Sequence, residues 1–262
     1  MASKAVALHN QIEGPEGAPV LVLSNSLGMT LEMWRDQAPA LSERYRLIRY
    51  DHRGHGDPPV SPGPYTLDDL GHDVLALRDS IGAERFSFCG LIVGGMVGMW
   101  LASEAPERVE RLVLCCSSAS FDPDAYRARA RTVREHGVAE VAGAALERWF
   151  TPEFRRSQSD VLEWAGRMLR KTPPEGYAAC CEAISGADLA GRLGGIRVPT
   201  LVIAGAEDPA APPGRSESIR DSVPDARLEV LSPAAHLANV ERPEAMTGAI
   251  LDHLQAVVRE ET

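Results

Sequence analysis

The sequence has no apolar run that approaches the roughly 18 residues needed to span a bilayer. Its N-terminal residues also lack the long apolar stretch and the small-residue cleavage site of a secretory signal. These absences argue against a membrane segment and against export. We therefore place the chain in the cytoplasm, with no membrane partner.

Positive charge is in deficit as well, since 27 Lys and Arg face 37 Asp and Glu for a net charge of −10. Phosphate binding needs a concentrated basic surface, so no nucleic-acid partner is expected. The five cysteines include the adjacent pairs Cys115-Cys116 and Cys180-Cys181 and show no zinc-ligand spacing. We interpret them as reduced, mostly buried thiols. The oligomeric state is left open by the sequence.

What the chain does contain is a repeated alternation of apolar, strand-like runs and helix-like stretches within 262 residues. Continuous apolar runs are typical of strands buried on both faces of a parallel sheet. The expected strands are 18–24, 46–50, 86–89, 112–115, 200–204 and 227–231, and the expected helices are 31–42, 66–81, 94–104, 214–222 and 243–258. This order predicts an α/β fold with a doubly wound, mostly parallel sheet.

Residues 122–197 interrupt the alternation, because they show only helical periodicity, as in 127–146 and 158–170. We predict that they form an inserted helical cap, while 1–121 and 198–262 form the core. A cap over the carboxyl ends of the strands would cover the usual ligand position of such sheets. Trp149 is then expected in the substrate pocket, although a simple place in the cap core is the alternative.

The sequence Gly90-Leu-Ile-Val-Gly94 follows a strand-like run and has the layout of the nucleophile elbow G-x-S-x-G of α/β-hydrolases. Ile92 occupies the serine position, and its side chain cannot form an acyl-enzyme. The elbow residue normally has a positive φ, which is strained for a β-branched side chain. Either the elbow has relaxed, or the strain is tolerated. The retained glycines favour the second alternative.

Two further polar residues each follow a strand: Asp208 after 200–204 and His236 after 227–231. Elbow, Asp, His is the order of the α/β-hydrolase triad. A carboxylate can fix one imidazole tautomer and stabilise the imidazolium, so a general base remains without a serine. We predict that His236 and Asp208 are catalytic. A purely structural histidine is the alternative.

The segment Ser24-Asn-Ser-Leu-Gly28 follows another strand, where these enzymes place half of the oxyanion hole. The N–H groups of Leu27 and Val93 are the predicted donors; the alternative is that Gly28 only makes a turn. We also expect substrate contacts from Ile92, Ser26, Trp149 and Trp34. Asp51-His-Arg-Gly-His-Gly56 lacks further ligands nearby, so neither a metal nor another cofactor is expected.

Long segments of the chain resemble the 3-oxoadipate enol-lactonase family. The resemblance is carried by 21–28, 50–56, 62–71, 172–182 and 201–209. It implies an α/β-hydrolase core with a helical cap, no cofactor, and a pocket for a small carboxylated enol lactone. By position, Asp208 and His236 match the family's acid and base, and Leu27 and Val93 match its oxyanion donors. The family has Gly-Leu-Ser-Met-Gly-Gly where this chain has Gly90-Leu-Ile-Val-Gly-Gly95.

Three functions are compatible with these residues. The one we favour from the sequence is non-hydrolytic acid–base chemistry on a carbonyl-containing small molecule, namely elimination, isomerisation, cyclisation or C–C chemistry, with cofactor-free oxygenation as a variant. This would make the protein an enzyme of the lyase, isomerase or cyclase type. The second is lactone or ester hydrolysis in which His236 activates water directly. The third is a catalytically silent binding protein.

Overall fold

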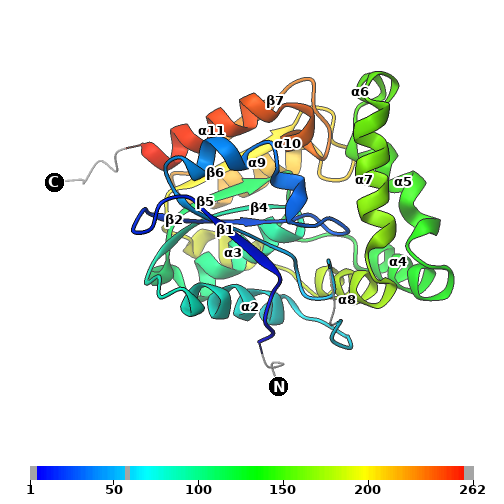
Figure 1. The fold of residues 1–262 in the computed structure, drawn as a ribbon, viewed down its shortest axis with the longest axis horizontal. Coiled ribbons are helices and arrows are strands. Elements are labelled where there is room, and N and C mark those ends of the chain that lie inside the picture. The colour runs from blue at the N-terminus through cyan, green and yellow to red at the C-terminus, as the bar shows by residue number, and fades with distance from the viewer. Residues whose placement is uncertain (1–4, 57–59, 257–262) are drawn as a thin grey trace.

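The computed structural model describes residues 5–56 and 60–256 (Figure 1). Its centre is a seven-stranded sheet with the order β1-β3-β2-β4-β5-β6-β7. All neighbouring strands are parallel except β1, which is antiparallel to β3. The strands are β1 (Asn10–Glu13), β2 (Val20–Ser24), β3 (Arg46–Tyr50), β4 (Phe86–Leu91), β5 (Val109–Cys115), β6 (Thr200–Gly205) and β7 (Arg227–Leu231). The predicted doubly wound, mostly parallel sheet is confirmed.

Helices cover both faces of this sheet, and Figure 1 shows α11 on one face and α2 and α3 on the other. The core helices are α1 (Ala38–Ser42), α2 (Leu67–Ser80), α3 (Val93–Glu104), α9 (Pro213–Ser222), α10 (Ala238–Glu241) and α11 (Pro243–Gln255), with 3₁₀ turns η1 (Leu31–Trp34) and η2 (Pro106–Arg108). A third 3₁₀ turn, η3 (Ala190–Gly195), belongs to the stretch predicted as cap but packs on α3 and α9 of the core. Strands β4 and β6 are buried along their whole length. Their apolar runs are therefore explained by helices on both sides.

Five helices lie between β5 and β6 and stand at one end of the sheet (Figure 1). They are α4 (Pro123–His136), α5 (Ala139–Trp149), α6 (Pro152–Ser157), α7 (Ser159–Lys171) and α8 (Pro174–Ser185). We call these helices the cap. Helix α4 packs on α8, and α5 packs on α7. The helical periodicity noted over 127–146 belongs to two helices, because Gly137, with φ 82°, separates α4 from α5.

Three core elements also differ from expectation. The stretch 31–42 is divided into η1 and α1, and the predicted helix 243–258 is helical to Gln255, with its last two residues outside the described part. Strand β1 was not predicted, since it is a short, partly exposed edge strand without an apolar run. Within the described ranges, the structure contains no helix with the length and apolar character that a membrane crossing requires.

Candidate functional site

Ile92 connects β4 to α3 in a tight elbow with φ 56° and ψ −108°. The backbone is held on both sides, since its N–H donates to the Cys115 carbonyl at 3.1 Å and its own carbonyl accepts from the Ser117 hydroxyl at 2.8 Å. A Cβ atom on Gly90 would lie 2.2 Å from the Gly94 carbonyl carbon. Close packing of strand and helix therefore maintains a conformation that is unfavourable for isoleucine by about 1 to 3 kcal/mol.

His236 and Asp208 form a buried pair beside this elbow. The His236 Nδ1 and Asp208 Oδ2 atoms are 2.7 Å apart. The other carboxylate oxygen accepts the N–H groups of Ala210 at 2.8 Å and Ala211 at 3.0 Å. With Nδ1–H donating to the carboxylate, Nε2 is the free, basic nitrogen. The arrangement fixes the tautomer that a general base requires and stabilises the imidazolium that forms after proton transfer.

Two buried histidines hold the loop after β2 in place by hydrogen bonds. The Gly28 N–H donates to His55 Nε2 at 2.9 Å, and His52 Nε2 lies 3.0 Å from the Asn25 carbonyl. A carbonyl can only accept, so the His52 proton is on Nε2, whereas His55 must carry its proton on Nδ1. Gly28 has φ 78°, and a Cβ atom there would lie 2.4 Å from the Leu169 side chain. Both constraints orient the peptide groups around Leu27.

These histidines predict a loss of stability in acid. Burial lowers the pKa of His52 from 6.5 to about 4 and, with the nearby His52, lowers that of His55 from 6.5 to about 3. Below pH 6.5 the unfolded chain takes up protons that the folded state excludes, so the free energy of unfolding falls from about pH 6.5 down to about pH 4 for His52 and to about pH 3 for His55. Denaturant titrations across this range measure the slope.

The variant His55→Gln provides the comparison for this prediction, because its amide oxygen can accept the Gly28 N–H but the side chain does not titrate. It is expected to show a shallower dependence of unfolding free energy on pH. An unchanged slope would contradict the assignment of His55 as a neutral acceptor.

A cavity of about 190 Å³ lies between the elbow at Ile92, the ring of His236 and the loop after β2. It is lined by Ser26, Leu27, Ile92, Phe121, Asp122, Ala125, Tyr126, Arg129, Ala145, Arg148, Trp149, Tyr177, Ala210, Arg215 and His236. Core and cap thus meet over the elbow and the histidine. Neither the Leu27 nor the Val93 N–H has a hydrogen-bond acceptor among the described residues. Val93 is fully buried in the first turn of α3 and is not among the residues that line the cavity.

Trp34 lies outside this lining. Its side chain is completely buried at the end of η1, within the hydrophobic core. The expectation that it contacts substrate is therefore not met, because η1 turns its indole into the core. Asp208 also lies outside the lining and reaches the cavity only through His236.

The cavity also contains three arginines that the sequence did not indicate: Arg129 on α4, Arg148 on α5 and Arg215 on α9. Arg215 donates to the Ser118 hydroxyl at 3.0 Å and to the Ser120 carbonyl at 2.9 Å. Within the described residues, none of the three has a carboxylate within ion-pair distance. Burial, and then the Arg129 guanidinium, lower the pKa of Arg148. Such a cavity is suited to an anionic ligand.

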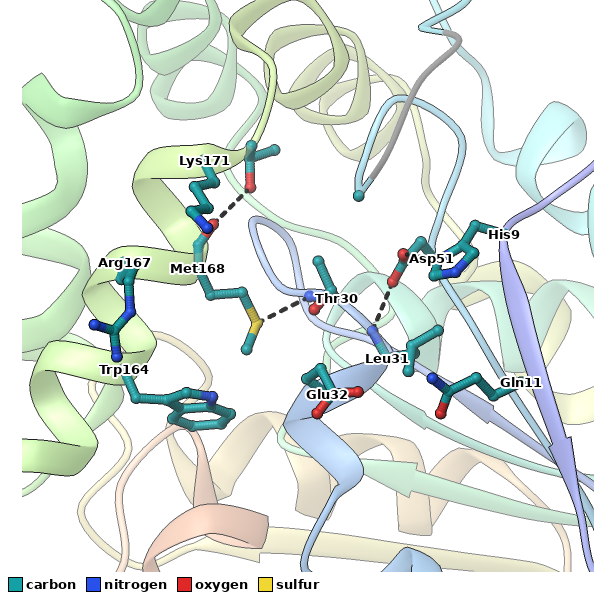
Figure 2. Close-up of a pocket in the computed structure, with 12 residues that line it drawn as sticks. His9, Gln11, Thr30, Leu31, Glu32, Asp51, Trp164, Arg167, Met168 and Lys171 are labelled. Carbon is teal, nitrogen blue, oxygen red and sulfur yellow. Dashed lines mark hydrogen bonds and ion pairs between the residues drawn. The ribbon is translucent and has the colours of Figure 1, made fainter.

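A second, larger cavity of about 320 Å³ lies between α7 and the segment that follows β2 (Figure 2). Its lining combines Trp164, Arg167, Met168 and Lys171 of α7 with His9, Asp51 and the Thr30–Glu32 segment. The Thr30 N–H donates to the Met168 sulfur at 3.1 Å, and the Leu31 N–H donates to Asp51 at 2.6 Å. This cavity includes neither Ile92 nor His236, so it is separate from the candidate active site.

Comparison with known proteins agrees with this geometry. Residues 19–243 match the family model described as the alpha/beta hydrolase fold. The chain is 39% identical to 3-oxoadipate enol-lactonase 2 of Acinetobacter baylyi, over 95% of this chain and 94% of that protein. The crystal structure of the enol-lactonase from Burkholderia xenovorans LB400 superimposes with a TM-score of 0.93 at 41% identity, covering 95% of this chain and 96% of that one.

A thermophilic esterase from Thermogutta terrifontis is also similar, with a TM-score of 0.89 and 30% identity over 95% of this chain and 93% of that chain. The named relatives are thus hydrolases of lactones and esters. The expectation of non-hydrolytic chemistry, whether of the lyase, isomerase or cyclase type, is therefore wrong. The relatives agree instead with the second predicted function, lactone or ester hydrolysis, which requires only water, a base and a polarised carbonyl.

Proposed function

Because the chain belongs to the α/β-hydrolase fold family and is similar along nearly its whole length to 3-oxoadipate enol-lactonases, we propose that it hydrolyses a small, carboxylate-bearing lactone. The observation that carries the proposal is the buried His236–Asp208 pair. Its histidine lines the same cavity as Ile92, whose side chain has no nucleophilic atom. We infer that Ile92 replaces the serine of the family's elbow and that water attacks the substrate directly.

In this mechanism, His236 Nε2 removes a proton from water as the oxygen attacks the lactone carbonyl carbon. Asp208, 2.7 Å from Nδ1, stabilises the imidazolium. The negative charge that develops on the carbonyl oxygen is held by the Leu27 and Val93 N–H groups. Collapse of the tetrahedral intermediate breaks the ring C–O bond, and the imidazolium returns its proton to the leaving enol oxygen. General-base catalysis contributes about 10² to 10⁴-fold, which suits a reactive enol ester.

The arginines of the cavity are the proposed partners of the substrate carboxylate. Arg129 and Arg148 extend from neighbouring cap helices into the same cavity as His236. A guanidinium presents paired N–H donors to a carboxylate, and the pair is stronger in a partly buried site than in water. The cap would therefore orient the lactone by its acid group, while the core supplies the base and the oxyanion donors.

Replacing Arg148 by methionine is expected to raise KM for 3-oxoadipate enol-lactone by about tenfold, with a smaller change in kcat, because a charged hydrogen bond to the bound substrate is lost. Steady-state kinetics measure both constants. Arg127→Met is the control, because Arg127 is an exposed residue of α4 that pairs with Asp124. An unchanged KM in Arg148→Met would exclude the carboxylate assignment.

The function itself is tested by following 3-oxoadipate enol-lactone in the presence of purified protein. Consumption above the buffer rate, with 3-oxoadipate as the product, is the expected result. A rate no higher than buffer at saturating lactone would refute the proposal.

A further inference from the structure

We propose that Ser26 is a further catalytic residue, whose hydroxyl donates to the substrate carbonyl oxygen as that oxygen becomes negative. This assignment rests on the proposed hydrolysis and adds a side-chain donor to the Leu27 and Val93 N–H groups. The donor would act at the step in which water attacks, when charge on the oxygen is greatest.

The hydroxyl of Ser26 is buried and has no partner in the described part of the chain. The residue is 1% exposed, and its Oγ atom makes no hydrogen bond to the protein. Buried hydroxyls are nearly always hydrogen-bonded, so an unpartnered one at a cavity wall is suited to pairing with a ligand. Ser26 lines the cavity together with Ile92 and His236.

The backbone N–H and carbonyl of Ser26 already make hydrogen bonds, so its hydroxyl is the group that can bind a ligand. Its N–H donates to the Met33 sulfur at 3.2 Å, and its carbonyl accepts the Met29 N–H at 3.2 Å. The next residue is Leu27, whose N–H is the predicted oxyanion donor. The hydrogen bond from the Gly28 N–H to His55 anchors the loop beside it. Because a hydroxyl hydrogen rotates freely about the C–O bond, the Ser26 hydroxyl can turn its donor toward an acceptor bound in the cavity.

A nucleophilic role for Ser26 is the competing assignment, since among the described residues that line the cavity it is the only serine, threonine or cysteine. A serine nucleophile needs a base within hydrogen-bond reach. Among the described residues, no hydrogen bond joins Ser26 to His236, whose ring pairs with Asp208. The geometry therefore favours donation over attack, and the two roles differ in whether an acyl group becomes attached to the protein.

The test compares Ser26→Ala, Ser26→Thr and Ser216→Ala. Ser216 is the matched control, because its hydroxyl is also buried and has no partner among the described residues, but lies outside the cavity. With 3-oxoadipate enol-lactone, Ser26→Ala is expected to lower kcat by about 10²-fold with little change in KM, as for loss of one oxyanion donor. Ser26→Thr should recover much of kcat through its hydroxyl, and Ser216→Ala should match the parent protein.

Intact mass of the protein and its affinity for the product distinguish a donor role of Ser26 from a nucleophilic one and from no contact at all. Intact mass of protein quenched during turnover should show no added acyl group; an adduct on Ser26 would overturn the donor assignment, as would an unchanged kcat in Ser26→Ala. Affinity for the product 3-oxoadipate, measured by calorimetry, should fall by about tenfold in Ser26→Ala but not in Ser216→Ala. If the parent protein fails to consume the lactone, the proposed function fails, and this affinity comparison still accepts or rejects the contact from Ser26.

Discussion

Replacing Ile92 by serine is expected to raise kcat for 3-oxoadipate enol-lactone by roughly 10² to 10³-fold, because it completes a Ser–His–Asp triad. The elbow has already the positive φ of 56° that such a nucleophile requires, and the His236–Asp208 pair is in place. Serine also lacks the second branch at Cβ that makes isoleucine unfavourable in this conformation. Initial rates at saturating lactone measure the gain.

The matched control for this substitution is Ile92→Ala, which relieves the same strain and enlarges the cavity without providing a hydroxyl. It is expected to stay near the parent rate and to resist a fluorophosphonate probe, whereas Ile92→Ser should gain the mass of the probe. Equal rates for the two variants would mean that the elbow does not present residue 92 to His236.

Replacing His236 by alanine is expected to lower kcat by about 10² to 10⁴-fold, since the base that activates water is lost. Asp208→Asn should also lower kcat, because the amide no longer fixes the Nδ1–H tautomer or stabilises the imidazolium. Both variants are assayed with the same lactone against the buffer rate.

His253→Ala is the control for loss of a buried histidine. The His253 ring is 2% exposed and lies near the Pro199 carbonyl, outside both cavities. This variant should lose stability but keep kcat. A kcat in His236→Ala that equals that of the parent protein would mean that His236 is not the general base, and it would contradict the proposed function.

The sheet and the order of the candidate catalytic residues were predictable because they depend on local sequence. Continuous apolar runs indicated β4 and β6, and the chain positions of Ile92, Asp208 and His236 follow the strand ends. Carboxyl ends of parallel strands lie at one edge of a sheet, so residues that follow them meet in space. Strand β1 escaped prediction because its pairing with β3 is decided by tertiary contact and not by its own composition.

The lining from the cap could not be derived in the same way. Arg129 and Arg148 belong to helices with many charged residues, and only the packing of α4 on α5 and α8 decides which side chains enter the cavity. Trp34 was misassigned for the same reason, since an aromatic residue near a site can equally turn into the core. The favoured chemistry failed for a different reason: an isoleucine at position 92 cannot itself form an acyl-enzyme, but it leaves room for attack by water, which the sequence offered as the second function.

The most direct test of direct water attack is turnover of 3-oxoadipate enol-lactone by the parent protein in H₂¹⁸O, with intact-mass analysis of the quenched protein. We expect consumption above the buffer rate, one solvent oxygen in the new carboxylate of the product, and no acyl group on the protein. Lactone consumption that yields a product without solvent oxygen, or an acylated protein during turnover, would contradict hydrolysis by water that His236 activates.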